Sequence, residues 1–447
     1  MAGPKRQLVL NVFLTRHGHH PGAWRQPQSP GGGNPSFAYW AEQVKTAERG
    51  KLDAVFFADF VGSGGADVRG AGRRPAGQGF EPLTLAGALA AITEKIGIVV
   101  TANTNFNEPF NLARRLASLD HLSGGRIGWN VVSSLSEGAG KTFGVDNPLE
   151  HAARYARAGE FIDVARQLWD SYEDGAFDHP DKVTGVFLDA GSIHPVHHAG
   201  EYFKVDALLD IARPIQGYPV FVQAGNSDTG REFAAKYAEM IYASVQLLED
   251  AQAYYSDVKG RMAKYGRHPD HLKITPGLSF AIGSSEQEAR DKFEALQASV
   301  NFTGPIELGG HDLTGYDLDG PLPDLPEPTN GKGRWQQLLK LARRENLSIR
   351  QLILRFNVVR GHRVLLGTPE QLADQIEDWF INGGADGFNL IPPLLPDSLR
   401  DFVDLVVPQL QRRGIFRTDY EGATLREHLG LPRPGHPHAA ARAVAAE

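Results

Sequence analysis

The sequence predicts an α/β fold, a (β/α)₈ barrel in which parallel strands alternate with helices. Two observations predict it. Short runs of β-branched and aromatic residues alternate with longer segments whose apolar residues recur at every third and fourth position. Eight such strand and helix pairs follow one another along the chain, which is the number that closes a barrel of this class. The length of 447 residues would also allow three ordinary domains, but such barrels accept long insertions and remain one domain.

The expected strands are short and rich in Val, Ile, Phe and Ala. They span residues 8–14, 54–59, 96–103, 126–133, 219–224, 240–245, 274–282 and 387–391. The helices expected behind them span residues 37–49, 82–93, 109–122, 152–172, 228–238, 249–265, 285–298 and 398–412. Several helices begin at side chains whose oxygens can accept hydrogen bonds from the amides of the first turn, as Ser284 and Ser285 can before Glu286.

Two segments are too long to be ordinary barrel loops. The first, residues 175–217, follows strand four, and the second, residues 300–367, follows strand seven and contains a helical pattern. Each is too small to bury a large core, so we expect lids or walls on a single domain that covers residues 1–431. The Pro- and Ala-rich residues 432–447 are expected to form a flexible tail.

Composition excludes several classes of function. The 46 Lys and Arg residues against 53 Asp and Glu residues give a net charge of −7, without the basic excess of a nucleic-acid binder. Apolar runs fall far short of the ~20 residues that a membrane helix needs, and the first residues do not resemble a secretory signal. Without cysteine, the chain has no disulfide, thiolate metal site or cysteine nucleophile. We therefore expect a cytoplasmic protein that binds a small molecule, and neither nucleic acid nor a membrane.

The usual nucleotide and hydrolase motifs are absent from the sequence. Residues 137–142 (EGAGKT) look like the end of a phosphate-binding loop, but Leu135 stands where that loop requires Gly. Residues 61–67 (VGSGGAD) follow strand two, yet they lack the third Gly of a dinucleotide site. There is no G-x-S-x-G sequence either, so a serine hydrolase is not supported.

Polar residues stand at the ends of five predicted strands, where a barrel carries its chemistry. They include His17, His19, His20, Asp59, Thr101, Asn103, Thr104, Asn130, Ser133, Ser134, Gly225, Asn226 and Ser227. Small polar residues at a helix start can bind a phosphate through backbone N–H groups, a hydroxyl and the helix dipole. The same spacing equally allows Ser227 or Asp228 to do no more than cap that helix.

Histidines cluster at residues 17–20 and 194–198, a pattern that could suggest a metal ion. No Asp or Glu stands at a recognised ligand spacing, and a loop histidine is more often solvated or hydrogen-bonded, so no metal site is expected. His151 and Tyr155 lie four residues apart on one face of a predicted helix. From their spacing alone they are interpreted as surface residues.

Several stretches together resemble the bacterial-luciferase-like flavin monooxygenases, and within them the two-component group that contains the nitrilotriacetate and dibenzothiophene-sulfone monooxygenases. They include HHPGAWR, AERGKLDAVFFAD, EPFNLARRLASLDHLSGGRIGWNVVSS, HAARYARAGEFIDVARQLWDS, VFVQAGNSDTGREFAAKYAE and GTPEQLADQIEDWFINGGADGFNLIPP. The resemblance extends over residues 8–431. It implies a TIM-type barrel that takes reduced FMN from a separate NAD(P)H:flavin reductase, and that uses O₂ to insert one oxygen atom into a small organic substrate.

The resemblance also assigns residues to the site. The FMN contacts that it implies are Asp59, Thr104, Asn130, His151, Tyr155, Gly225 and Ser227. It implies His19 and His311 as catalytic hydrogen-bond partners or proton donors near the flavin, although Gly310 and Asp312 depart from the family pattern around His311. A reactive flavin needs a dry pocket. Phe13 and Phe57 are expected to line it, and Phe56, Phe60 and Phe106 are further candidates.

The substrate class and the assembly are expectations of the same kind. Aromatic strand ends favour an apolar or aromatic, sulfone-like substrate, whereas an anionic one would need several arginines, for which Arg16, Arg25, Arg73 and Arg74 are candidates. A homodimer or homotetramer is expected. Two alternatives remain open: a deazaflavin-dependent oxidoreductase on the same barrel, and a barrel that only binds a small molecule or has a structural role.

Overall fold

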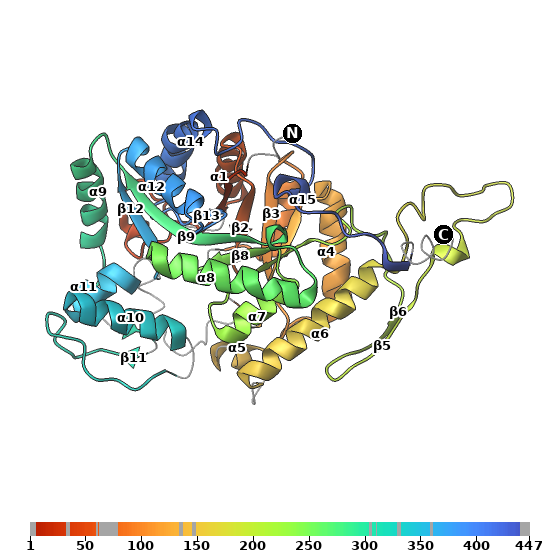
Figure 1. The fold of residues 1–447 in the computed structure, drawn as a ribbon, viewed down its shortest axis with the longest axis horizontal. Helices are drawn as coiled ribbons and strands as arrows, with labels where there is room; N and C mark the ends of the chain where they lie inside the picture. The colour runs from red at the N-terminus through yellow and green to blue at the C-terminus, as the bar shows by residue number, and fades with distance from the viewer. Residues whose placement is uncertain are drawn as a thin grey trace.

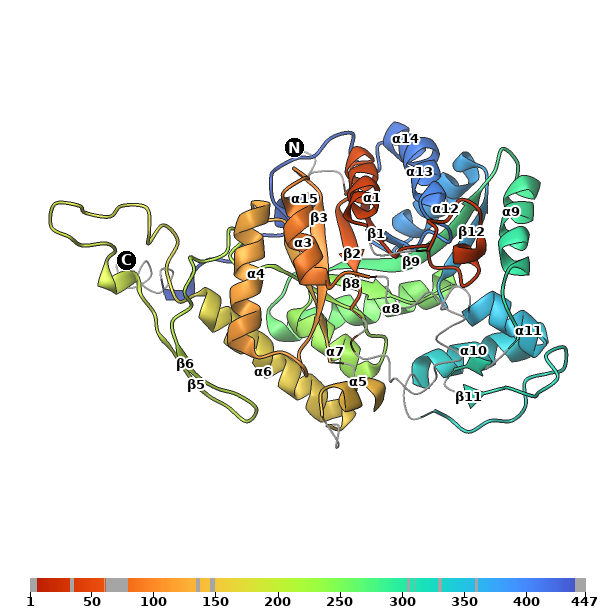
Figure 2. The same ribbon diagram turned by 180° about the vertical axis from the view of Figure 1, so that it is seen from behind.

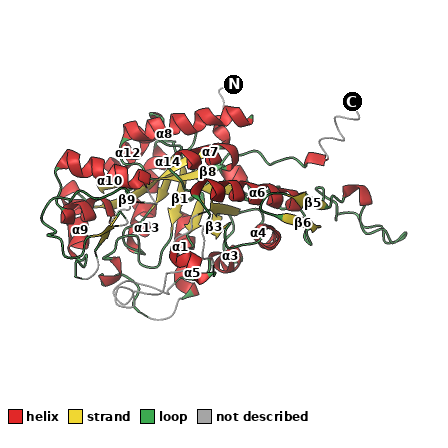
Figure 3. Cartoon of the chain, turned by 90° about the horizontal axis from the view of Figure 1, so that it is seen from below, coloured by secondary structure: helices red, strands yellow, loops and turns green. Residues whose placement is uncertain are grey.

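The computed structural model describes residues 6–32, 36–59, 61, 79–133, 137–144, 149–303, 306–309, 311–328, 332–357 and 361–438. A barrel of parallel strands lies at its centre, and helices cover the outside of the barrel (Figures 1 and 3). Among the described residues, no helix combines the length and the apolar character needed to cross a bilayer.

All eight expected strands are present. They are β1 (Val9–Phe13), β2 (Ala54–Phe57), β3 (Gly97–Asn103), β4 (Ile127–Val132), β7 (Val220–Gln223), β8 (Met240–Ala243), β9 (Lys273–Ile282) and β13 (Gly387–Leu390). Neighbouring strands pair in parallel, and the pairings of β8 with β9, β9 with β13 and β13 with β1 close the barrel. The predicted fold class is therefore confirmed.

A ninth strand, β12 (Arg363–Gly367), was not expected. It pairs in parallel with the second half of β9, from Leu278 to Ile282, and so lies outside the closed ring of eight. The helix α12 (Pro369–Ile381), also not expected, follows it and begins at a capping box formed by Thr368 and Gln371. Both elements lie between β9 and β13 in the sequence and are additional to the eight expected strand and helix pairs.

The expected helices all form, with small changes at their ends. They are α1 (Phe37–Arg49), α3 (Pro82–Ala90), α4 (Pro109–Ser123), α6 (His151–Trp169), α7 (Asp228–Tyr237), α8 (Leu248–Arg261) and α9 (Glu286–Ala298). The last one is divided into α13 (Asp397–Asp401), a π-helical turn (Phe402–Val406) and α14 (Val407–Arg412). Pro408 has no N–H for the carbonyl of Asp404, which explains why the regular helix is interrupted just before it.

Alternate side chains of the strands form two separate apolar layers. Val9, Phe13, Phe56 and Val99 point into the barrel, whereas their sequence neighbours pack outward against the helices. The short helix α15 (Leu425–His428) closes the N-terminal end of the strands, which we call the base of the barrel. A Cβ atom at Gly97 would lie 2.5 Å from a methyl carbon of Leu425, so this close approach requires Gly. The opposite, C-terminal end, which we call the mouth, is where a site can form.

The first excursion, residues 175–217, projects from the side of the barrel. It carries an antiparallel hairpin of β5 (Val196–Ala199) and β6 (Lys204–Ala207), and the C-terminal segment lies beside it (Figures 1 and 2). The described part of the expected tail, residues 432–438, is held there. Arg433 forms an ion pair with Asp174 at 2.6 Å, while residues 439–447 lie outside the described residues.

The second excursion stands at the mouth end of the barrel, opposite α15 (Figures 1 and 2). It comprises the hairpin of β10 (Glu307–Leu308) and β11 (His311–Asp312), and the helices α10 (Lys332–Glu345) and α11 (Ile349–Leu352). Its buried residues, among them Leu313, Trp335 and Phe356, form a small apolar cluster of their own. At the same end, α5 (Glu137–Thr142) occupies the EGAGKT segment.

Candidate active site

Aromatic side chains form a wall inside the barrel near the mouth. The ring centroid of Phe13 lies 5.1 Å from that of Phe56 and 6.0 Å from that of Tyr242. Tyr242 stacks on His362 at 4.9 Å, and a hydrogen bond of 2.8 Å joins its hydroxyl to His362 Nε2. These four residues, Phe13, Phe56, Tyr242 and His362, form what we call the aromatic wall.

Phe57 does not belong to the aromatic wall, which corrects the expectation that it lines the pocket. Successive residues of a strand point to opposite faces. Phe56 therefore points into the barrel, whereas Phe57 points outward and meets Trp40 of α1 at a centroid distance of 5.8 Å. Of the further candidates, Phe106 stacks on Phe143 at 4.3 Å, and Phe60 lies outside the described residues.

Of the three clustered histidines, His19 contacts Phe13 of the aromatic wall. Its ring meets Phe13 edge-on at 4.5 Å, and its Nε2 donates to the carbonyl oxygen of Phe13 at 2.9 Å. His17 Nδ1 is hydrogen-bonded to Ser29 Oγ at 2.7 Å. His20 packs toward Phe293, and burial lowers its pKa to about 4. His20 is therefore neutral at physiological pH.

His311 lies in the second excursion. It is on β11, where its ring centroid is 4.6 Å from that of Trp335. Its Nε2 is buried and has no hydrogen-bond partner among the described residues. The described contacts of His311 are thus made within the excursion, and none of them joins it to the aromatic wall.

The loop after β7 meets α6 and forms a small polar cradle. Ser227 caps α7, since its Oγ accepts from Gly230 N at 3.1 Å. A Cβ atom at Gly230 would lie 3.1 Å from both Ser227 Oγ and the Tyr155 hydroxyl, and one at Gly225 would lie 3.1 Å from the same hydroxyl. Two hydroxyls thus converge at a helix N-terminus where only glycines leave room. We call this group, Tyr155, Gly225, Ser227 and Gly230, the cradle.

The charge and burial around Tyr155 distinguish it from a surface residue. Burial raises the pKa of its hydroxyl, which the hydrogen bond to Ser227 and the positive charge of Arg154 partly offset. Arg154 Nε is itself buried without a hydrogen-bond partner among the described residues. His151, at the start of α6, lies 5.1 Å from Tyr155 between ring centroids. No pattern in the sequence singles out Arg154, whose position beside the cradle depends on how α6 packs.

The expected polar residues of strands two to four line the mouth on neighbouring strands. Asp59 follows β2, and its pKa is raised by partial burial and, to a smaller extent, by the charge of Glu81. Asn130 donates from Nδ2 to Thr101 Oγ1 at 2.9 Å, and its Oδ1 is buried without a partner among the described residues. Thr104 is fully buried, and its hydroxyl donates to a backbone carbonyl at 3.3 Å.

Two further asparagines lie inside the barrel, and the sequence analysis did not predict them as site residues. Asn11 of β1 and Asn389 of β13 are register partners, and both are almost fully buried. The Oδ1 atom of each has no hydrogen-bond partner among the described residues. Buried polar groups are ordinarily satisfied. Together with Asn130, they place amide oxygens that are unpaired among the described residues at three positions in the interior of the barrel.

Comparison with known proteins agrees with this geometry. The sequence pattern of the luciferase-like monooxygenases matches residues 14–387. Nitrilotriacetate monooxygenase component A from Aminobacter aminovorans is 48% identical over 445 residues, which cover 97% of this chain and 98% of that protein. N-acetyl-S-(2-succino)cysteine monooxygenase from Bacillus subtilis (strain 168) is 45% identical over 441 residues, or 97% and 99% of the two chains.

A solved structure shows the same architecture over nearly the whole chain. The EDTA monooxygenase (EmoA) from Chelativorans sp. BNC1 superposes with a TM-score of 0.81 at 33% identity, covering 96% of this chain and 99% of that one. The barrel with an aromatic wall, the cradle at the start of α7 and these matches lead to one conclusion. The chain belongs to the luciferase-like monooxygenase family, and it is an oxidoreductase of the monooxygenase type.

Proposed function

We propose that this protein is the oxygenating component of a two-component monooxygenase, which takes reduced FMN from a separate NAD(P)H:flavin reductase. The observation that carries the proposal is the cradle at the N-terminus of α7. A relative at 48% identity is itself named component A, which supports a second, separate protein. When bound, reduced FMN supplies the two electrons that let one atom of O₂ enter the substrate while the other leaves as water.

The cradle suits the phosphate of FMN. The N-terminus of α7 contributes the positive end of its dipole, and the hydroxyls of Ser227 and Tyr155 can each donate a hydrogen bond. Arg154 adds a positive charge nearby, because its field lowers the pKa of Tyr155. Gly225 and Gly230 leave the space that a Cβ atom would fill. The donor set therefore fits a phosphate monoester.

The strand ends of β2 to β4 suit the ring of the flavin. An isoalloxazine ring carries both N–H donors and carbonyl acceptors, and Asn130 Oδ1 is an acceptor without a partner among the described residues. Asp59 and His151 are assigned to the same cofactor. The aromatic wall, through Phe13 and Phe56, keeps water from the reacting atoms. His19 lies against Phe13, and we assign it to hydrogen bonding near the flavin. We assign His311 to the same role from the side of the pocket formed by the second excursion.

The experiment is a single-turnover reaction with chemically reduced FMN. We expect ¹⁸O₂ to label the product when reduced FMN, O₂ and substrate are mixed with the pure protein. Oxidised FMN with NADH should give no product until a flavin reductase is added. Product formed from NADH and oxidised FMN without a reductase would overturn the two-component assignment.

The substrate is proposed to present an apolar or aromatic group to the aromatic wall. Two of the arginines considered as ligands for an anionic substrate lie among the described residues, and both donate to backbone carbonyls. Arg16 donates to Gly31 O at 2.9 Å, and Arg25 donates to Ser299 O at 2.6 Å. The two sequence relatives are named for anionic compounds, which makes aminopolycarboxylates and S-(2-succino) thioethers the rival class. A screen should therefore pair aromatic sulfones with these acids. Oxygenation of the acids alone would refute the apolar class and leave the monooxygenase assignment standing.

A homodimer or homotetramer is proposed as the assembly. Val183 and Phe187 on the first excursion are 96% and 64% exposed, which favours burial against a second copy. Light scattering behind a sizing column measures the mass directly, and a strictly monomeric protein at micromolar concentration would contradict the proposal.

A further inference from the structure

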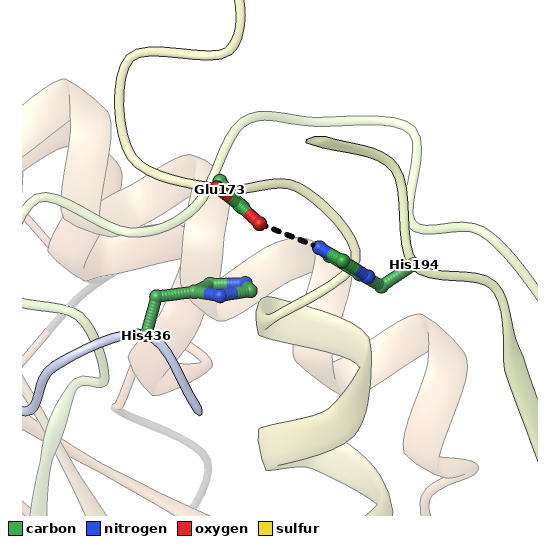
Figure 4. A group of neighbouring side chains, drawn as sticks. All are labelled: Glu173, His194 and His436. Atoms are coloured by element: carbon green, nitrogen blue, oxygen red, sulfur yellow. Dashed lines mark hydrogen bonds and ion pairs between the residues drawn. The ribbon is translucent and has the colours of Figure 1, made fainter. Parts of the chain in front are cut away.

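Three side chains of the kinds that bind metal ions meet beside the first excursion, on the side of the barrel rather than at its mouth. Glu173 follows α6, His194 precedes β5, and His436 belongs to the C-terminal segment (Figure 4). One ligand atom of each lies within 4.8 Å of those of the other two. His194 Nε2 and Glu173 Oε1 are 2.9 Å apart.

The backbone fixes the first two of these residues next to each other. The N–H of Glu173 donates to Ser192 O at 3.1 Å, and the N–H of His194 donates to Ser171 O at 2.8 Å. These bonds do not depend on either side chain. The backbones of Glu173 and His194 are therefore held side by side before any ligand arrives, which reduces the entropy lost on binding.

His436 supplies the observation that points to a ligand. Only 4% of the residue is exposed. Its Nε2 lies 3.1 Å from the carbonyl oxygen of Asp170, which can only accept, so Nε2 carries the proton. Its Nδ1 is then a bare lone pair, and this atom is buried without a hydrogen-bond partner among the described residues. A backbone carbonyl that binds the far nitrogen is the arrangement that orients histidine as a metal ligand.

The surrounding charges permit a cation. Two guanidinium groups lie near the C-terminal segment, and each is matched by a carboxylate. Arg213 pairs with Asp170 at 2.8 Å, and Arg433 pairs with Asp174 at 2.6 Å. Because these ion pairs offset the arginine charges, they limit the repulsion that the arginines would exert on a bound ion.

We propose that Glu173, His194 and His436 bind one divalent transition-metal ion, Zn²⁺ being the best match. Two histidines and one glutamate are a recognised donor set for Zn²⁺, with water in the fourth position. In a tetrahedral site two such ligand atoms lie about 3.4 Å apart, so the 2.9 Å pair of His194 and Glu173 needs to open only slightly. The ion lies between the two side chains in place of the Nε2 proton of His194, and the neutral ring then carries its proton on Nδ1.

The bound ion joins the C-terminal segment to the first excursion. Without it, the segment is held by Arg433 and by the hydrogen bond from Arg213 to Pro434 O at 3.2 Å. No metal site was expected at these residues, because metal ligands are recognisable in a sequence mainly when they stand at short spacing. Glu173 and His194 are 21 residues apart, and His436 comes from the far end of the chain.

The test uses the full-length protein, stripped of metal with a chelator and then titrated with ZnCl₂ in a calorimeter. We expect one equivalent to bind per chain, and Co²⁺ to give the visible absorption of a site with low coordination number. Zn²⁺ should also raise the melting temperature and slow proteolysis of the C-terminal segment. Turnover with reduced FMN should not change when the chelator is present, because the ion lies away from the mouth.

Matched variants identify the ligands. His194→Ala, His436→Ala and Glu173→Gln should each weaken Zn²⁺ binding by about tenfold or more. His197→Ala is the control, since His197 lies on the same excursion with a side chain that is 71% exposed, and it should bind as the wild type does. Circular dichroism verifies that each variant is folded. Failure of the wild type to bind Zn²⁺ or Co²⁺, or wild-type affinity in His436→Ala, would reduce the group to a hydrogen-bonded His–Glu pair.

Discussion

The hydroxyl of Tyr155 lies 3.1 Å from the place that a Cβ atom would take at Gly225. The same Cβ would be only 2.4 Å from Nε2 of Gln223, so Gly225→Ala must displace that amide and crowd the cradle. We expect this variant to bind FMN about tenfold more weakly, a loss of about 1.4 kcal/mol that a flavin fluorescence titration measures.

The control for this prediction is Gly260→Ala. Gly260 lies in α8, and no atom stands within 4 Å of the Cβ that would be added. FMN affinity should be unchanged there, while the helix gains about 0.5–1 kcal/mol of stability. Equal FMN affinity in the two variants would show that the cradle does not hold the cofactor.

Ser227 and Ser285 form a matched pair for separating helix capping from phosphate binding. Each caps a helix, with Oγ accepting from an amide at 3.1 Å in Ser227 and 3.2 Å in Ser285. Replacing either with Ala should cost about 1 kcal/mol of folding stability. Only Ser227→Ala should also weaken FMN binding, by about 1–2 kcal/mol. Riboflavin, which lacks the phosphate, should bind both variants alike, and an unchanged FMN affinity would remove Ser227 from the site.

Substitutions of Phe56 and Phe57 test which face of β2 contacts the substrate. Both are almost fully buried, at 2% and 4% exposure, so Phe→Leu at either position should lower stability by a similar amount. Phe56→Leu alone opens the aromatic wall, and we expect more of the reduced flavin to yield hydrogen peroxide instead of product. Peroxide and product are measured in one reaction. Greater uncoupling in Phe57→Leu would mean that the outward position contributes to the pocket.

Acid should destabilise the protein through His20. Burial lowers its pKa to about 4, against 6.5 when it is exposed in the unfolded chain. Between these two values the unfolded state binds more protons, so the free energy of unfolding falls as pH falls through this window. From pH 7 to pH 5 the contribution is about 2 kcal/mol. His20→Gln should lose less stability over that range in urea denaturation, and a pH slope identical to that of the wild type would contradict the assignment.

Much of the barrel could be predicted because each strand is a short apolar run with a helix behind it. The strand β12 was not predicted, because its apolar run, from Val364 to Leu366, is only three residues long. Inward and outward positions could not be told apart on β2, since both Phe56 and Phe57 are apolar and buried. The alternation of inward and outward positions along a strand can be read from a sequence only when one face of the strand is polar.

The candidate site shows the same limit of prediction from sequence. Gly225 and Ser227 precede a helix, which the local sequence predicts, but Tyr155 reaches them only because α6 packs against α7. Its spacing alone suggested a surface position. Glu173, His194 and His436 are the extreme case, as no local pattern connects them. Residues that meet through tertiary packing carry no signature in one sequence.

The closure of the barrel has a consequence for how the chain is made. β1 acquires its second neighbour only when β13 pairs with it, and the base stays open until Leu425 reaches Gly97. During translation the earliest strand therefore waits with an unpaired edge while almost the whole chain follows it. Such edges invite pairing between nascent chains. We expect the barrel to be completed only after residues 387–425 have left the ribosome, so the yield of active protein should rise with chaperone supply and with slower, cooler expression.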